Sequence, residues 1–461
     1  MEPTAKAHDF LEGLKAILRA RDAEALEAFA EDVRPQHILD EWDELEADER
    51  EALLRVLPAE KTAELFSNLP EDDQPEALHA MGDPVAKQVL EELDPDDLAD
   101  TLQNLEAQDP AQASSLKALL EPETLAVVEA LGEYEEEEAG GLMTPHFISL
   151  RASMTVDQVL AFLRKSAPDA ETIYYLYVVD EAHRLQGVLS LRDLIVSASN
   201  TPIREIMDPD IVTVQTNTDQ EEVARIMADY DFSVLPVIDE EGKLVGIITV
   251  DDVLDVVEEE ATEDIHRLGA APIDIDYVRA NAWLLFLKRA KWLVLLVVSM
   301  TLTTQVLSHY EEVLDQLVIL TFFIPLLIGT GGNVGSQVAT LVVRALATRE
   351  LEPSDYFRVF VKECGTGLLL GASFGAFIAF YVSFLSDGDP RIAVALGITM
   401  VLIALTANLV GASLPFLFRR FGIDPALTSS PGITTIMDVV GLLIYFRVVL
   451  WILGPMLGTG G

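Results

Sequence analysis

A single carboxylate stands in the last apolar stretch of the sequence, TTIMDVVGLLIYF (residues 434–446). A charge inside a bilayer costs about 2.5–3.5 kcal/mol on insertion scales, so such a residue usually faces a bundle interior or a water-filled path. The next base along the chain, Arg447, is nine residues away, or about 13 Å along a helix, which is too far for direct pairing. We therefore expect Asp438 to bind a cation in a pore. The alternative is that it caps a helix beginning as late as Ile436.

Amide side chains and glycines mark a second apolar stretch, PLLIGTGGNVGSQVAT (residues 325–340). Glycines weaken a helix, and in lipid the freed backbone groups must be satisfied by protein or by water in a cavity. Asn333 and Gln337 are spaced i and i+4, so they share one helix face. Close packing of helices through small residues is the alternative. The residues expected to line a pore are Gly331, Gly332, Asn333 and Asn408.

These residues belong to a series of five apolar runs in the C-terminal half. The runs are 292–310, 316–343, 364–386, 392–418 and the segment with Asp438 up to about residue 456. A transmembrane helix needs about 20 mostly apolar residues, so five spans are predicted, with Asp438 as their only carboxylate. Bases gather before the first run, between the second and third, and between the fourth and fifth. The positive-inside rule therefore predicts a multi-pass protein of the cell (inner) membrane with cytoplasmic N-terminal domains and an outside C-terminus.

The charge of the chain is concentrated in its N-terminal half. The 461 residues have a formal net charge of −46, and residues 283–461 hold 11 acids and 11 bases, so the whole excess lies in residues 1–282. Such acidity excludes a nucleic-acid partner, which requires basic surface. The single cysteine, Cys364, permits no internal disulfide.

Residues 1–132 read as an all-α superhelix of short helices. Six prolines are spaced 11 to 15 residues apart, namely Pro58, Pro70, Pro84, Pro95, Pro110 and Pro122. Proline starts helices well but cannot stand inside them. The clearest unit is LDPDDLADTLQNL, with Asp94 or Asp96 as cap. It lacks the glycine and terminal glutamate of an EF-hand loop, so a self-contained calcium site is not expected.

Residues 133–257 contain an internal repeat, with copies at 141–200 and 204–257. Each copy reads strand, helix, strand, turn, strand, helix, and each ends in a glycine, a hydroxyl residue and an aspartate at fixed spacing. This duplicated α/β pattern resembles a tandem pair of CBS domains. The resemblance implies a possible ATP site near Ser190, Asp193, Thr249 and Asp252, since many such pairs bind adenine nucleotides. A CBS pair used only as a regulatory dimer interface is the alternative.

The segment VDDVLDVVEEEATEDIHRLGA (residues 250–270) leads from the repeat toward the first apolar run and is rich in acids. A solvated helix face is the plain interpretation. Like charges at i and i+4 destabilise an isolated helix, however, so something positive should offset them, and few bases stand nearby. We expect a linker helix at 258–282 and a transmembrane domain at 283–461.

The order of these parts resembles the MgtE family of magnesium transporters and channels. The resemblance implies a homodimer in the lipid bilayer, a pore on its two-fold axis, and Mg²⁺ bound by Asp438. It also implies that cytosolic Mg²⁺ holds the linker helix as a plug against the pore. The carboxylates that the resemblance assigns to further Mg²⁺ are Glu64, Asp96, Asp100, Asp231, Asp252, Asp255, Glu260, Glu263, Asp264 and, at the cytosolic mouth, Asp424.

Other functions remain as alternatives with fewer residues behind them. A membrane-anchored CBS nucleotide sensor would not need a glycine-rich span or an intramembrane aspartate. A carrier of another divalent cation, such as Co²⁺ or Mn²⁺, would share every feature above. An enzyme is not expected, because the seven histidines form no catalytic motif and the chain has neither a nucleophile elbow nor a Walker loop.

Overall fold

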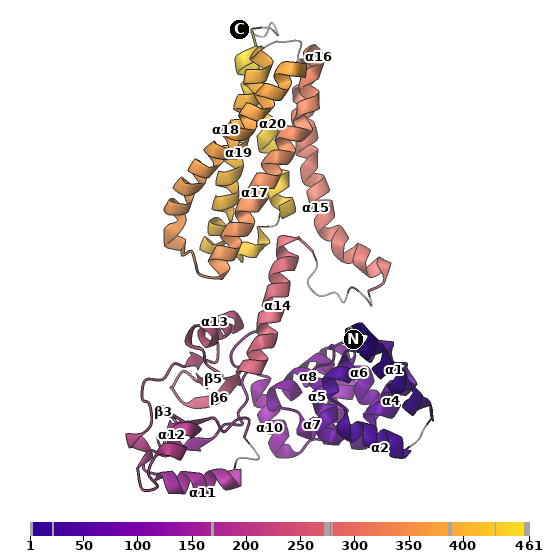
Figure 1. Ribbon diagram of the computed structural model, residues 1–461, viewed down its shortest axis with the longest axis vertical. Helices are drawn as coiled ribbons and strands as arrows, with labels where there is room; N and C mark the ends of the chain where they lie inside the picture. Colours follow the sequence, from indigo (N-terminus) through magenta and orange to yellow (C-terminus); the bar gives the residue numbers. More distant parts are fainter. Residues whose placement is uncertain are drawn as a thin grey trace. The chain divides into compact units, whose positions relative to one another are not determined.

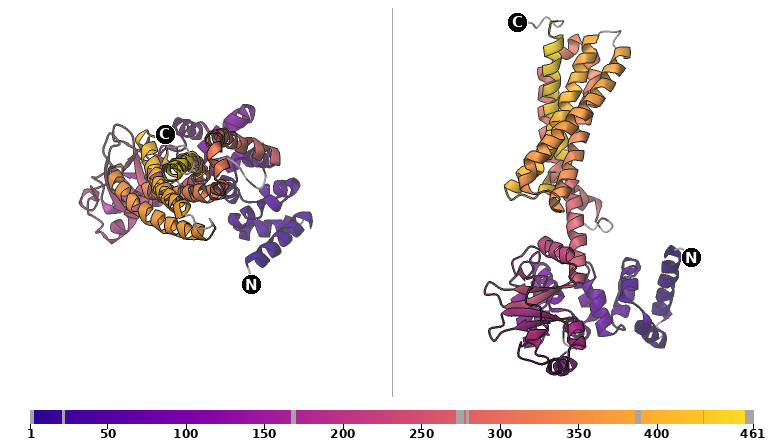
Figure 2. Two further views of the ribbon diagram at one scale, coloured as in Figure 1. Left: turned by 90° about the horizontal axis from the view of Figure 1, so that it is seen from above. Right: turned by 60° about the vertical axis from the view of Figure 1, so that its left-hand side comes forward.

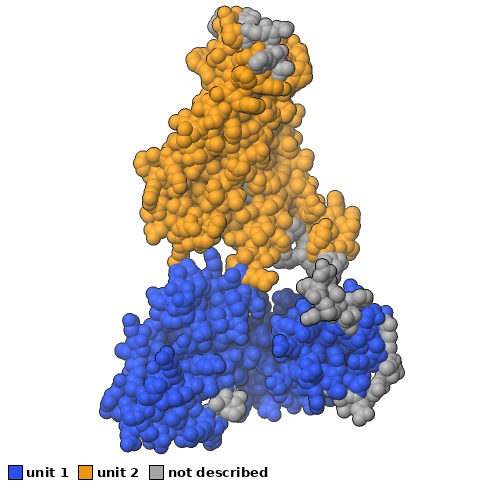
Figure 3. Space-filling model, in the orientation of Figure 1, with its two compact units in different colours: residues 1–257 blue, residues 258–461 orange. Residues whose placement is uncertain are grey.

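The computed structural model describes residues 3–20, 23–166, 170–271, 277, 280–385, 390–428 and 430–455. The chain forms two compact units, residues 1–257 and 258–461, which are coloured separately in Figure 3. The first unit joins the helical N-terminal part to the repeat, and the second holds the long apolar helices. This multidomain architecture, with a helical majority, is the predicted one.

Short helices build the first part of unit 1. They are α1 (Pro3–Ala20), α2 (Ala23–Asp32), α3 (Pro35–Leu39), α4 (Ala47–Leu54), α5 (Ala59–Ser67), α6 (Gln74–Met81), α7 (Asp83–Glu92), α8 (Pro95–Gln108), α9 (Pro110–Lys117) and α10 (Pro122–Leu131), with a 3₁₀ turn η1 (Trp42–Glu44). Prolines stand in the first turn of six of these helices, where the missing N–H costs no hydrogen bond. The predicted string of proline-started helices is thus confirmed.

Buried leucines fix the orientation of α8, which carries several of the candidate acids. Leu98, Leu102 and Leu105 recur at helical spacing, each only 1% exposed, and they belong to one hydrophobic core that extends into the repeat. Asp94 stands at the N-cap of α8, so Asp96 lies in its first turn. This packing turns the acidic start of α8 toward the repeat.

The repeat forms two three-stranded sheets of the same topology. The first has β1 (Ser149–Leu150), β2 (Tyr175–Val179) and β3 (Leu185–Ser190), with helices α11 (Val156–Ser166) and α12 (Leu191–Val196). The second has β4 (Val214–Gln215), β5 (Val234–Ile238) and β6 (Leu244–Thr249), with 3₁₀ turn η3 (Ile203–Glu205), α13 (Gln220–Tyr230) and α14 (Val250–Leu268). In each sheet the first pair is parallel and the second antiparallel. The predicted duplication is confirmed at the level of strand order.

The motif glycines serve the contact between the two copies. A Cβ on Gly187 would lie 2.7 Å from Sδ of Met207, and a Cβ on Gly246 would lie 2.7 Å from Cγ of Met143. The methionines hold matching places, each just before the first strand of its own copy, and each packs on the third strand of the other copy. The two copies therefore exchange their leading segments.

The acidic linker, predicted as a helix over 258–282, begins within a longer helix. It is the second half of α14, which runs without a break from Val250 to Leu268. Glycine or proline is absent between these residues, and the first breaker is Gly269, followed by Ala270 with a φ of 50°. Residues 272–276 and 278–279 lie outside the described part of the chain.

The described residues of unit 2 form five helices long and apolar enough to cross a membrane. They are α15 (Ala282–His309), α17 (Ile324–Ala347), α18 (Tyr356–Leu385), α19 (Pro390–Arg420) and α20 (Ser430–Leu453). The shorter elements are α16 (Glu311–Gln316), η4 (Val318–Phe323), η5 (Pro353–Asp355) and η6 (Pro425–Leu427). The helices extend past the uncharged runs, so Glu363 lies within α18 and Asp438 is not their only carboxylate. The helices include charged residues in their end turns, whereas the predicted runs were bounded by the first charged residue on each side.

Glycines allow the long helices to approach closely (Figures 1 and 2). On α18, Gly367, Gly371 and Gly375 are spaced four apart, and a Cβ on any of them would lie within 3.0 Å of α19 backbone atoms. Gly411 of α19 meets the backbone of α17, where its Cβ would be 2.4 Å from the carbonyl oxygen of Gly335. Helix α15 differs, since none of its described residues is buried.

Candidate functional site

Carboxylates from three parts of unit 1 act on one another around the start of α8. Asp96 is 9% exposed and its Oδ1 has no hydrogen-bond partner. Burial raises the pKa of Asp96 well above its usual range, and the charges of Asp252 on α14 and Asp97 on α8 raise it further. The second copy of the repeat thus brings its final aspartate to the acidic end of the N-terminal helices.

The neighbouring acids share this environment. Burial, with repulsion from Asp94 and Asp252, raises the pKa of Asp97 to about 7. Burial and the charges of Glu136, Asp97 and Glu71 raise the pKa of Asp100 to about 7. The pKa of Asp252 rises to about 6, mainly by burial, although the hydroxyl of Thr249 donates to its Oδ2 at 2.7 Å and opposes the shift. We call Asp96, Asp97, Asp100 and Asp252 the sensor acids.

Three members of this environment were not among the predicted site residues: Asp97, Glu136 and Glu171. Burial and the charges of Asp94 and Asp252 raise the pKa of Glu171 to about 7. The pKa of Glu136 is also raised, by burial and by Glu71. Glu171 comes from the connection between α11 and β2, and no local sequence signal connects it with α8.

The sensor acids do not converge on one point. Among the described residues, no three histidine, cysteine or acidic side chains are arranged so that they could hold one metal ion directly. Mg²⁺ keeps several of its waters and is commonly bound through one or two carboxylates. The cluster therefore fits a hydrated cation held through water, and does not form a closed cage.

The other predicted carboxylates of unit 1 lie elsewhere or at the edge of this cluster. Asp255 on α14 contributes to the raised pKa of Asp97. Glu64 is exposed on α5. It is not among the residues whose charges raise the pKa of Asp100. Asp231 ends α13 in the left-handed region with a φ of 55° and is exposed. These two lack the shielding that marks the sensor acids.

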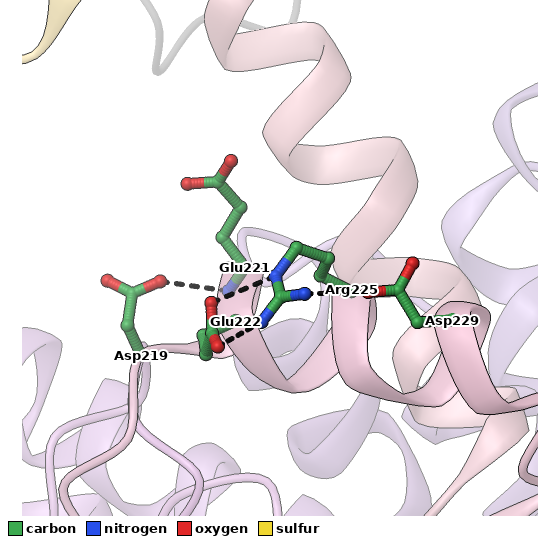
Figure 4. Close-up of polar contacts among 5 residues, drawn as sticks. All are labelled: Asp219, Glu221, Glu222, Arg225 and Asp229. Carbon is green, nitrogen blue, oxygen red and sulfur yellow. Dashed lines mark hydrogen bonds and ion pairs between the residues drawn. The ribbon is translucent and has the colours of Figure 1, made fainter. Parts of the chain in front are cut away.

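Helix α13 shows how acids are compensated where a base is present (Figure 4). Arg225 donates from Nε to Glu222 at 3.0 Å and from Nη1 to Asp229 at 2.6 Å, while Asp219 caps the helix by accepting from the N–H of Glu221. Around the sensor acids, by contrast, the charges of described residues that shift their pKa values are all negative.

A second acidic group lies in unit 2, at the end of α14. Arg267 donates one Nη to Glu263, on the same helix, and the other to Oδ2 of Asp424, in the turn before α20. Burial and the charges of Asp424 and Glu260 raise the pKa of Asp264, whereas Arg267 lowers it. Little positive charge was expected in this segment, and the two ion pairs of Arg267 correct that expectation. Its partner Asp424 is 157 residues away, so the pairing could not be read from local spacing.

A cavity of about 500 Å³ lies between the two copies of the repeat, and both copies line it. Its lining includes Tyr175, Ser190, Asp193, Tyr230 and Phe232, and the last two rings stack with centroids 5.3 Å apart. Ser190 donates to Oδ2 of Asp193 at 2.5 Å and caps α12. Two aromatic faces and a carboxylate fit the base and ribose of a nucleotide.

Thr249 and Asp252 do not line this cavity, although the repeat predicted equal roles for both copies. The charge of Asp252 instead acts on Asp96, and its Oδ2 accepts a hydrogen bond from the hydroxyl of Thr249. The physical reason is that Asp252 lies close enough to the acidic start of α8 to raise the pKa values of Asp96 and Asp97, which changes the surroundings of an otherwise equivalent motif.

In the apolar bundle, Asp438 lies in the third turn of α20, which begins at Ser430. It is therefore not a helix cap, and its side chain is half-buried. Asn333 is exposed on α17, together with Gln337 and Thr340 at helical spacing. These polar side chains form an open polar face, which we define as Asn333, Gln337 and Thr340.

The remaining residues expected to line a pore lie between helices of the same chain. A Cβ on Gly331 would lie 2.7 Å from Cγ2 of Ile403, and one on Gly332 would lie 2.8 Å from Cγ2 of Thr434. Asn408 is fully buried, and its Nδ2 donates to the carbonyl of Ala404 at 2.8 Å. The structure thus gives these three residues the packing role that was the alternative for the glycines.

Comparison with known proteins assigns each part of the chain. The family model described as a divalent cation transporter matches residues 324–448, and that of the MgtE intracellular N domain matches 33–137. CBS domains match 139–199 and 203–259. The magnesium transporter MgtE of Thermus thermophilus is 53% identical over 436 residues, which cover 94% of this chain and 96% of that protein. This chain belongs to the MgtE family of magnesium transporters.

Further relatives within the MgtE family agree. The MgtE of Bacillus subtilis is 31% identical over 94% of this chain and 96% of its own length. A solved relative is described as the crystal structure of the cytosolic domain of the Mg²⁺ channel MgtE in complex with ATP. Its sequence is 57% identical, the match spans 53% of this chain and 98% of that one, and the TM-score is 0.52. The predicted family is therefore confirmed, and with it a transport protein instead of an enzyme.

Proposed function

We propose that this MgtE family member is a magnesium channel of the cell membrane that cytosolic Mg²⁺ closes. The observation that carries the proposal is the position of Asp438. This carboxylate lies inside a helix long and apolar enough to cross a membrane, and its side chain is only half-buried by the rest of the chain. Intramembrane carboxylates are costly unless they face a cavity or a partner. A hydrated cation in a water-filled path supplies both.

The open polar face of α17 supports assembly as a homodimer. Two exposed amides and a threonine are unfavourable against lipid, so they are expected to be covered by protein or water. A second copy related by a two-fold axis would bring two Asp438 carboxylates and two such faces around one path. Mg²⁺ keeps its waters, and a pair of carboxylates suits it in that form.

The orientation follows from the loop charges. Bases flank the cytosolic ends of the proposed spans, so the positive-inside rule places unit 1 in the cytoplasm and the C-terminus outside. The sensor acids then meet the Mg²⁺ that has already entered the cell. At low Mg²⁺ their repulsion disfavours the compact arrangement of unit 1, and bound ions stabilise it at high Mg²⁺. The transported ion would thus limit its own entry.

A nucleotide is the proposed ligand of the cavity between the two copies of the repeat. The solved relative with ATP supports this assignment, as do Tyr175, Ser190 and Asp193 in the lining. Asp193→Asn should weaken ATP binding about tenfold or more, whereas Thr249→Ala, outside the cavity, should leave it unchanged. Calorimetric titration of the purified protein with ATP measures both, and equal losses in the two variants would contradict the assignment.

Flux measurements on the purified protein in liposomes test the proposed function. A channel of this kind should admit Mg²⁺ down its gradient, and millimolar Mg²⁺ on the side of unit 1 should inhibit the flux. Competition with Co²⁺ and Mn²⁺ measures the preference among divalent cations. Absence of any cation flux would favour the membrane-anchored CBS sensor.

A further inference from the structure

Arg267 occupies an unusual place in a chain with more than twice as many acids as bases. Four carboxylates act around the end of α14 in unit 2: Glu260, Glu263, Asp264 and Asp424. Arg267 pairs directly with two of them, one on its own helix and one in the turn that precedes α20.

The Asp424 side chain is fixed from both sides. Its Oδ1 accepts from the backbone N–H of Ala426 at 2.7 Å and so caps the 3₁₀ turn η6, while its Oδ2 accepts from Arg267. Ser430, the first residue of α20, follows six residues later, and Asp438 lies on that helix. The guanidinium therefore ties α14 to the segment from which the Asp438 helix starts.

The chemistry of the guanidinium suits this bridge. Its planar fork presents separate N–H groups, so it can hold two carboxylates at once, whereas an ammonium acts as a point charge. The side chains of Arg267, Glu263 and Asp424 are 29%, 22% and 31% exposed, which shelters the pairs partly from screening by salt.

We propose that Arg267 is a built-in cation that clasps α14 to the turn before α20, so that part of the closed arrangement needs no bound Mg²⁺. This inference rests on the proposed function, since it concerns the gating of that channel. A divalent cation that binds Glu263 and Asp424 must displace the guanidinium. Arg267 thereby sets how far the channel closes when the ion is scarce.

Four variants of the full-length protein in liposomes test the clasp, with Mg²⁺ outside and chelator on the side of unit 1. Arg267→Gln removes the charge, and Asp424→Asn removes its partner. Arg267→Gln combined with Asp424→Asn tests whether both act through one contact. The matched control is Arg225→Gln, because Arg225 also pairs with two carboxylates but lies on α13, in unit 1.

With chelator present, Arg267→Gln and Asp424→Asn should each raise Mg²⁺ flux roughly three- to fivefold, which is the scale expected of a partly sheltered ion pair. The double variant should show no further increase, and Arg225→Gln should match the unmodified protein. Unchanged flux in both single variants, or additive increases in the double variant, would overturn the clasp. A failure of the proposed function is distinct, because the unmodified protein would then show no Mg²⁺ flux or no inhibition by Mg²⁺.

Discussion

Acidic side chains occur in two different electrostatic environments in this protein. On α13 and at the end of α14, an arginine holds each acidic group together, as with Arg225 and Arg267. Around Asp96, burial and repulsion from other carboxylates raise the pKa, and Oδ1 of Asp96 has no hydrogen-bond partner among the described residues. Buried like charges are stable only when a proton or a cation is added.

The raised pKa values predict how the stability of unit 1 depends on pH. Asp97, Asp100 and Glu171 have pKa values of about 7 in the folded chain, above the usual value near 4, so the folded state binds more protons between these limits. Without metal, the free energy of unfolding should therefore fall as pH rises from about 5 to 8. Thermal melts of residues 1–271 in chelator should show a decrease on the order of 5 °C. A melting temperature that rises over this interval would contradict the assignment.

Single residues were predictable where the chemistry was local. The sequence singled out Asp438 because a carboxylate is rare in an apolar run, and it named Asp96, Asp100 and Asp252 through a family resemblance. Glu136 and Glu171 were missed, since their closeness to the sensor acids depends on the tertiary fold. The difference between Ser190 and Thr249 was also unpredictable, because it arises from what packs on each copy.

Among the elements, helices were predictable from breakers and from apolar length. Prolines marked the starts of the short helices, and five apolar runs became five long helices. Helix α14 runs across the predicted start of the linker at residue 258, because no breaker stands between Val250 and Leu268, although the two compact units divide at that position. The predicted run for α18 began too late, at residue 364, because the first turns of the helix contain charged residues.

The glycine seams between the long helices give a prediction at this scale. Gly411→Ala should destabilise the bundle by about 1–3 kcal/mol, because its Cβ would lie 2.4 Å from a carbonyl oxygen of the α17 backbone, which cannot rotate away. Gly329→Ala is the matched control, with nothing within 4 Å of the added carbon. Thermal melts in detergent compare the two, and equal stability of both variants would show that the seam is less tight than described.

For the whole molecule, binding of Mg²⁺ to unit 1 should appear as added stability. A ligand that prefers the compact state stabilises it by mass action. Millimolar Mg²⁺ should therefore raise the melting temperature of residues 1–271 at pH 8 by several degrees, and more than at pH 5, where protons already neutralise the sensor acids. Asp96→Asn combined with Asp252→Asn should reduce this gain. An equal response to Mg²⁺ in the variant would place the sensing elsewhere.

The role of Asp438 as a cation site is tested most directly by measuring Mg²⁺ flux through the Asp438→Asn variant and the unmodified protein in liposomes. Asparagine keeps the shape and the hydrogen-bonding capacity of the side chain and removes only its charge. Because Asp438 lies inside α20 and not at its cap, the helix does not depend on that charge. If the carboxylate holds a hydrated cation in the path, the variant should fold, insert and lose most of its Mg²⁺ flux, by about tenfold or more. Full flux through a well-folded Asp438→Asn protein would contradict the central claim.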